Sequence, residues 1–181
     1  MAHKQQQEFL QSVKERFPER FKDCRVLDVG SLDINGNSKF LFEGEYKYLG
    51  IDIGWGRNVD VVIRGHEFRD LEGFNIVMNL ECAEHDEYWD KTFRNCIHLL
   101  KPGGLLLFTC ATEGRQEHGT RRTTPQDSPF TSQLENDYYK NLTEEHIKNV
   151  ITLDYWFEKY EFSVNDGTKD LYLFAIKRNH Y

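Results

Sequence analysis

Two acidic residues and one glycine stand at positions where a protein can bind a nucleoside. Asp28 and Gly30 end a short apolar run, Ser31 follows them, and Asp52 ends the next apolar run. Glycine allows the chain to turn sharply and lets a ligand approach the backbone closely. An acidic side chain at the end of a second strand can accept hydrogen bonds from both hydroxyl groups of a ribose. Each residue alone is also typical of a tight turn, but on successive runs they together predict a nucleoside-binding site.

The turn after the first run lacks the glycine pattern that binds a pyrophosphate. Dinucleotide-binding turns carry three glycines so that the phosphates can approach bare backbone amides at the start of a helix. Here Ser31, Leu32 and Asp33 follow Gly30. Asp28 and Asp33 bring negative charge to the turn, which repels a pyrophosphate and attracts a cation. The pattern therefore indicates a cationic nucleoside cofactor and argues against a nicotinamide-dependent reductase.

A second group of polar residues follows the fourth apolar run. Asn79 is expected to line a cleft at the carboxyl end of that strand, where open α/β sheets bind ligands. Glu81, Glu84 and His85 are candidate catalytic residues, because a carboxylate or an imidazole can take a proton from a hydroxyl group. Glu81 is the first candidate for this base. Glu84 and His85 are equally typical of residues that brace the start of the following helix.

Residues 112–142 form a long polar segment that we expect to be a substrate loop or lid. Its candidate substrate-binding residues are Arg115, His118, Arg121 and Arg122. Such a cationic group can bind a carboxylate or a phosphate. The alternative is a surface loop in which these residues pair with Glu113 and Glu117. The aromatic residues Phe130, Tyr138 and Tyr139 either close over a substrate or pack the loop onto its own domain.

The elements that must position these residues follow from hydrophobic periodicity. The short apolar runs RVLDVG, YKYLGIDI, VDVVI, FNIVMNL and GLLLFTCA predict a mostly parallel twisted sheet with helices on both faces. Helical spacing predicts helices over residues 5–16, 86–100 and 143–153, the last capped by Thr143. Residues 101–104 predict a turn into the fifth strand. Two final runs, residues 156–164 and 170–177, predict a C-terminal antiparallel hairpin.

Length and composition restrict the class of protein. The 181 residues are 39% hydrophobic and 29% charged, which predicts a single α/β domain over residues 1–181, with residues 1–22 as an N-terminal helical cap. The net charge of -7 disfavours nucleic acid as a partner. No apolar run is long enough to span a membrane, so we expect a cytoplasmic protein. Cys24, Cys82, Cys96 and Cys110 form no CxxC pair, so we expect buried thiols and no metal site.

The order of motifs resembles that of a known family. VLDVGSLDINGN resembles the glycine-rich first motif of Rossmann-like S-adenosylmethionine-dependent methyltransferases, and YLGIDI resembles their acidic second motif. FNIVMNLECAEH resembles the fourth-strand segment FDVVxxxEVLEH, and LLKPGGLLLFTCA resembles the fifth-strand motif. Together the four motifs cover most of residues 25–111. The resemblance implies a Rossmann-like domain, S-adenosylmethionine as cofactor, and an enzyme that transfers a methyl group by in-line displacement.

The resemblance also assigns roles to individual positions. It implies that Asp28 and Gly30 hold the methionine end of the cofactor, that Ser31 also binds the cofactor, and that Asp52 binds the ribose. Gly65 and His66 would lie near the adenine.

One position departs from the pattern of the family. Many relatives carry an aspartate where this chain has Arg64, so recognition of the adenine amino group is expected to use backbone groups, His66 or Glu67. The acceptor is not specified by the sequence, since a sugar, a small carboxylate metabolite or a nucleotide-linked intermediate all fit. An inactive cofactor-binding or interaction subunit is the alternative function.

Overall fold

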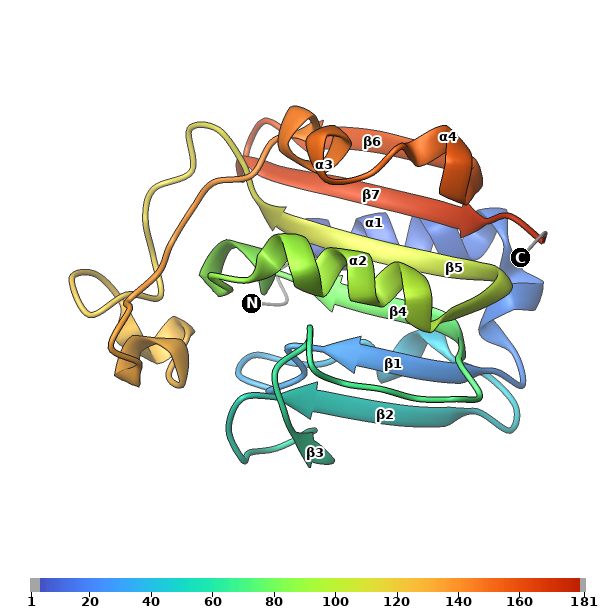
Figure 1. Cartoon of the computed structure of the whole chain (residues 1–181), viewed down its shortest axis with the longest axis horizontal. Helices are drawn as coiled ribbons and strands as arrows, with labels where there is room; N and C mark the ends of the chain where they lie inside the picture. The colour runs from blue at the N-terminus through green and yellow to red at the C-terminus, as the bar shows by residue number, and fades with distance from the viewer. Residues whose placement is uncertain (1–3, 180–181) are drawn as a thin grey trace.

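The structure is a computed structural model that describes residues 4–179, and it is built on one seven-stranded sheet (Figure 1). The strand order is β3-β2-β1-β4-β5-β7-β6. The strands are β1 (Arg25–Val29), β2 (Lys47–Asp52), β3 (Val61–Val62), β4 (Phe74–Leu80), β5 (Leu100–Ala111), β6 (Phe157–Asn165) and β7 (Asp170–Lys177). The first five are parallel, whereas β7 runs antiparallel to both β5 and β6. The predicted α/β class, the mostly parallel sheet and the C-terminal hairpin are confirmed.

The topology brings three strand ends together. The chain leaves β1 toward β2 and β3 and then returns to the other side of β1 as β4. In this register Val29 pairs with Ile51 of β2 and with Asn79 of β4. The connections that follow β1 and β4 therefore leave the same edge of the sheet in opposite directions and open a crevice between them, where ligands bind in such folds.

Helices cover both faces of the sheet, as predicted (Figure 1). Helix α1 (Lys4–Arg16) packs Leu10 and Val13 on one face, in a core that includes Met78 of β4. Helices α2 (Trp89–Leu99), α3 (Glu144–Val150) and α4 (Leu153–Trp156) pack on the other face. Within residues 4–179, none of the helices is both long and apolar enough to cross a membrane.

Helix α2 begins later than residue 86, where it was predicted to start. The Asp86 carboxylate accepts hydrogen bonds from the Tyr88 amide at 2.8 Å and the Thr92 hydroxyl at 2.5 Å, which holds residue 86 in the connection before the helix. At the other end Leu100 already belongs to β5. The predicted turn at residues 101–104 is wrong, because this stretch is an irregular beginning of β5, with a shift of register against β4.

Two other elements are shorter than predicted. The run VDVVI forms only the two-residue strand β3, because Val59 and Asp60 are tied to a turn and to β2 by backbone hydrogen bonds. The helix predicted over residues 143–153 is divided, because Ile151 has extended backbone angles and a second helix begins at Leu153. Its predicted N-cap is confirmed, since the Thr143 side chain accepts a hydrogen bond from the His146 amide.

Candidate active site

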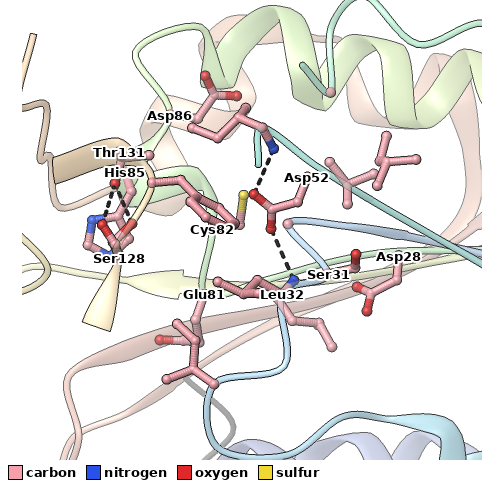
Figure 2. A pocket seen from close by; sticks show the side chains of 18 of the residues that line it. Asp28, Ser31, Leu32, Asp52, Glu81, Cys82, His85, Asp86, Ser128 and Thr131 are labelled. Carbon is pink, nitrogen blue, oxygen red and sulfur yellow. Dashed lines mark hydrogen bonds between the residues drawn. The ribbon is translucent and has the colours of Figure 1, made fainter. Parts of the chain in front are cut away.

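A pocket lies at the carboxyl ends of β1, β2 and β4 (Figure 2). It contains about 1210 Å³ of empty space, part of it open to solvent, and residues 127–138 of the long loop contribute one wall. Figure 2 shows Asp28 and Asp52 on one side of Cys82, and His85, Ser128 and Thr131 on the other. The pocket therefore combines the predicted nucleoside-binding residues with the side chains that follow β4.

The first turn of the pocket depends on Gly30. Its φ angle is +81°, a conformation that side chains disfavour. A Cβ atom at this position would lie 2.4 Å from Sγ and 2.6 Å from Cβ of Cys82, which follows β4. The Gly30 and Ser31 amides both donate to the Ile51 carbonyl oxygen, and the Ser31 hydroxyl donates to the Asn58 carbonyl oxygen. Glycine is thus required here by both the backbone angle and the close approach of Cys82.

Asp52 joins the end of β2 to this turn. One carboxylate oxygen accepts the Leu32 amide at 3.0 Å and the other accepts the Ile53 amide at 2.7 Å (Figure 2). Burial raises the pKa of Asp52, while these two amide hydrogen bonds lower it. Because a carboxylate has about four acceptor positions, two remain for hydroxyl groups of a ligand.

Asp28 lies deeper than Asp52 and has polar neighbours. Its Oδ2 atom accepts the Tyr48 hydroxyl at 2.5 Å and the Asn58 amide group at 3.5 Å. Burial raises the pKa of Asp28 to about 6, although the Tyr48 hydrogen bond acts in the opposite direction. The negative charge of Asp52 raises it further. A cationic group bound beside Asp28 would favour its ionised form.

Glu81 is held at the end of β4 in a conformation that is unusual for a side chain other than glycine. Its φ angle is +51°, and its amide donates to the Thr109 carbonyl oxygen at 2.9 Å. The Gln6 side chain of α1 donates to the Thr109 hydroxyl, and Gln6 and Glu81 both line the pocket. Strained backbone of this kind occurs preferentially at functional sites. Gln6 carried no functional signal in the sequence, because it lies in a helix whose spacing indicates only packing.

The other two catalytic candidates differ in position. His85 lines the pocket, whereas Glu84 is fully buried behind it and accepts the Ala111 amide through one carboxylate oxygen. Burial and the nearby charge of Glu81 raise the pKa of Glu84 to about 8. Burial and the neighbouring His118 lower the pKa of His85 to about 3, which leaves the imidazole neutral at pH 7.

Residues around the predicted adenine site and at the end of β4 are divided between the pocket and positions outside it. Gly65 and Arg64 line the pocket. His66 does not, because its ring packs on that of Tyr88 with 4.6 Å between centroids. Asn79 is also outside the pocket, and its side-chain amide donates to the Val29 carbonyl oxygen at 3.4 Å. The cofactor contacts predicted for His66 and Asn79 stay predictions.

None of the four candidate substrate-binding residues of the long loop lines the pocket. Arg121 and Arg122 form ion pairs with Asp137, and Arg122 also pairs with Glu117 at 2.7 Å. Arg115 donates to the Thr168 carbonyl oxygen. This placement favours the alternative of a paired surface loop for the arginines.

His118, the fourth of these residues, lies beside His85, and their ring centroids are 5.1 Å apart. It thus comes close to the pocket without lining it.

The loop contributes other residues to the pocket. Phe130 packs so closely on the backbone that a Cβ atom at Gly54 would lie 2.6 Å from its ring. Ser128, Thr131 and Tyr138 line the pocket with it, whereas Tyr139 contacts the rings of His85 and His118. The aromatic character of Phe130 and Tyr138 was the signal for a closing loop. Ser128 and Thr131 carried no signal in the sequence.

Comparison with known proteins identifies the family. The family model described as a methyltransferase domain matches residues 1–165. The chain belongs to this methyltransferase-domain family. The family predicted from the four motifs is thereby confirmed. No protein of curated function matches this methyltransferase in sequence.

Solved methyltransferase structures share the fold at low sequence identity. A didemethyltoxoflavin N1-methyltransferase of Burkholderia thailandensis, with bound S-adenosylhomocysteine, is 12% identical, with 96% of this chain and 78% of that chain covered and a TM-score of 0.64. The N-methyltransferase NodS of Bradyrhizobium japonicum, also with S-adenosylhomocysteine, is 12% identical, with 96% of this chain and 87% of that chain covered and a TM-score of 0.62. The magnesium protoporphyrin IX methyltransferase of Synechocystis, with bound S-adenosylmethionine, is 13% identical, with 94% of this chain and 79% of that chain covered and a TM-score of 0.60.

Proposed function

We propose that this methyltransferase binds S-adenosylmethionine in the pocket and transfers its methyl group to a small-molecule acceptor. The observation that carries the proposal is the meeting of the Gly30 turn, the Asp52 carboxylate and residues 127–138 around one cavity at the switch point of the sheet. The similar structures named above hold S-adenosylmethionine or S-adenosylhomocysteine. These features support a shared cofactor.

The residues of the pocket fit this cofactor. Gly30 lines the pocket, in a turn whose backbone angle and close approach to Cys82 both require glycine. Asp52 retains acceptor positions for the two ribose hydroxyl groups after binding the Leu32 and Ile53 amides. Asp28 offers a buried carboxylate to the ammonium group of the methionine end. Ser31, which also lines the pocket, would contact the same end of the cofactor.

When bound, S-adenosylmethionine supplies a methyl group that its sulfonium has already activated. In an in-line displacement the carbon–sulfur bond breaks as the bond to the acceptor forms, and a hydroxyl acceptor then loses its proton. Glu81 is the proposed base, because it lines the pocket and carries a carboxylate. Phe130 and its neighbours in residues 127–138 would exclude water and align the acceptor.

The proposed acceptor is a small molecule, such as a sugar or another metabolite. The pocket is lined both by the Gly30 turn and by residues 127–138 of the loop, so an acceptor would lie between the cofactor and the loop. The expectation of an anionic acceptor rested on the basic residues of the loop, and Arg121 and Arg122 are instead paired with acids on the surface. We therefore propose a small acceptor without assigning its charge.

Calorimetric titration with S-adenosylmethionine tests the cofactor. Wild-type protein should bind one equivalent, and Asp52→Ala should weaken binding by about 1.5–3 kcal/mol, or roughly tenfold to a hundredfold. Asp52→Asn is a second variant of similar size that keeps one oxygen acceptor, so that only one of the two backbone amides retains its hydrogen bond. Asp166→Ala is the matched control, because this carboxylate is 92% exposed in the turn between β6 and β7.

A screen of acceptors for release of S-adenosylhomocysteine then tests turnover. Release with at least one small-molecule acceptor supports the proposal. Cofactor binding without turnover on any acceptor would favour the alternative of a non-catalytic subunit. Failure of the folded wild-type protein to bind S-adenosylmethionine would overturn the proposed function.

A further inference from the structure

Three potential metal ligands meet between the pocket and the long loop. Glu84 and His85 lie in the short 3-10 helix Ala83–His85 after β4, and His118 comes from the loop after β5. One ligand atom from each residue lies within 4.8 Å of the others. In a tetrahedral site with metal–ligand distances of about 2.1 Å, two ligand atoms lie about 3.4 Å apart. Small side-chain rotations would therefore bring the three atoms around one cation.

The Glu84 carboxylate has an unmet requirement for a partner. Its side chain has no solvent exposure. One oxygen accepts the Ala111 amide at 3.2 Å, whereas Oε2 has no hydrogen-bond partner among residues 4–179. Burying a carboxyl oxygen without a partner costs free energy, and such groups usually bind an ion or another polar group. A cation beside Oε2 would supply the missing interaction.

Both imidazoles can present a lone pair to the same point. His118 Nδ1 lies 3.2 Å from the Gln116 carbonyl oxygen, which can only accept, so Nδ1 carries the hydrogen and Nε2 carries the lone pair. Metal-binding histidines commonly donate their second nitrogen to a carbonyl group in this way. His85 Nδ1 is buried and has no hydrogen-bond partner in the described part of the chain.

We propose that Glu84, His85 and His118 bind a divalent transition-metal cation of the Zn²⁺ or Co²⁺ type. Two imidazoles and one carboxylate suit such ions, whereas Mg²⁺ and Ca²⁺ prefer oxygen ligands alone. The sequence predicts no metal site from the spacing of its cysteines, but this spacing carries no information on Glu84, His85 and His118. The three ligands proposed here come from two segments that are separated by the whole of β5.

The site lies at the wall of the pocket, because His85 and the nearby Glu81 both line that pocket. A cation with three protein ligands keeps open positions that can take a hydroxyl oxygen of an acceptor, and it lowers the pKa of that hydroxyl. The acceptor class would then be an alcohol or a phenol. This consequence rests on the proposed methyl transfer, whereas binding of the cation does not.

Metal binding is tested directly on protein freed of metal by a chelator. Co²⁺ is added stepwise while its visible absorption is recorded, and Zn²⁺ binding is measured by calorimetry. Wild-type protein should bind one equivalent of either ion. His118→Ala should weaken binding at least about tenfold, the lower end of the loss seen even when residues around metal ligands are changed. His98→Ala is the matched control, because this exposed histidine lies on α2 outside the cluster.

Further measurements distinguish failure of the proposed metal site from failure of the proposed methyl transfer. Glu84→Gln should also lose Co²⁺ binding, and circular dichroism checks its folding because the side chain is buried. Since His118 does not line the pocket, His118→Ala should bind S-adenosylmethionine like the wild type. Absence of saturable Co²⁺ binding to the folded wild type, or equal binding by His118→Ala, would overturn the metal site and leave the proposed methyl transfer untouched.

Discussion

Replacing Gly30 with alanine should destabilise the protein through two separable effects. The backbone has φ of +81° here, and a side chain in left-handed backbone costs about 1–2 kcal/mol. The new methyl group would also lie 2.4 Å from Cys82 Sγ, and overpacking of this kind typically costs about 1–3 kcal/mol. We expect Gly30→Ala to lower the free energy of unfolding by about 2–5 kcal/mol in total.

Two comparisons assign these effects to their causes. Gly114 also has positive φ, +88°, but a Cβ atom there would meet nothing nearer than 3.6 Å, so Gly114→Ala carries similar backbone strain without the contact. In the double variant Gly30→Ala, Cys82→Gly the contact is removed and the strain remains. The single control variant should therefore have a higher free energy of unfolding than Gly30→Ala. The double variant should also have a higher value than Gly30→Ala, once the effect of Cys82→Gly alone has been subtracted.

Urea denaturation followed by circular dichroism measures the free energies of unfolding. Titration with S-adenosylhomocysteine measures the affinity of the pocket for this ligand. Gly30→Ala should weaken cofactor binding more than Gly114→Ala does, because the strained turn carries Ser31 and Leu32 at the cofactor site, whereas Gly114 does not line the pocket. Equal destabilisation by the two single substitutions would refute the role assigned to Cys82. Wild-type affinity in Gly30→Ala would mean that the turn does not approach the cofactor.

Three further predictions concern the charge and closure of the pocket. Because burial raises the pKa of Asp28 to about 6, its carboxyl becomes protonated as pH falls through 6, and binding of the cationic cofactor should weaken about tenfold from pH 7.5 to pH 5. Titration of Asp28→Asn with S-adenosylmethionine should give an affinity that changes little over that pH range. Because Arg121 and Arg122 are paired on the surface, changing both to glutamine should alter stability by less than about 1 kcal/mol and leave the KM for the acceptor unchanged. A raised KM with unchanged cofactor affinity would instead support acceptor binding by these arginines. Phe130→Ala should raise the KM for the acceptor at least about fivefold, since the ring closes one wall of the pocket, and kinetics equal to wild type would contradict that role.

Part of the candidate site was predictable because its signals are local. Gly30 and Asp52 stand at the ends of apolar runs, and the burial of each strand follows from its own composition. The order of the motifs then brought both residues to one edge of the sheet, where the structure has its pocket. The boundaries were less predictable, because the continuous apolar spacing over residues 143–153 does not record the extended backbone at Ile151 that divides the segment into α3 and α4.

The sequence by itself thus determined the fold class, the family and the ends of the strands that form the pocket. Only the tertiary structure decided which residues of the long loop reach the pocket and which pair on its surface. Phe130 packs on Gly54, and His118 packs on His85, through contacts between segments far apart in the chain. Such contacts depend on the shapes of both partners after folding, and neither composition nor periodicity records them.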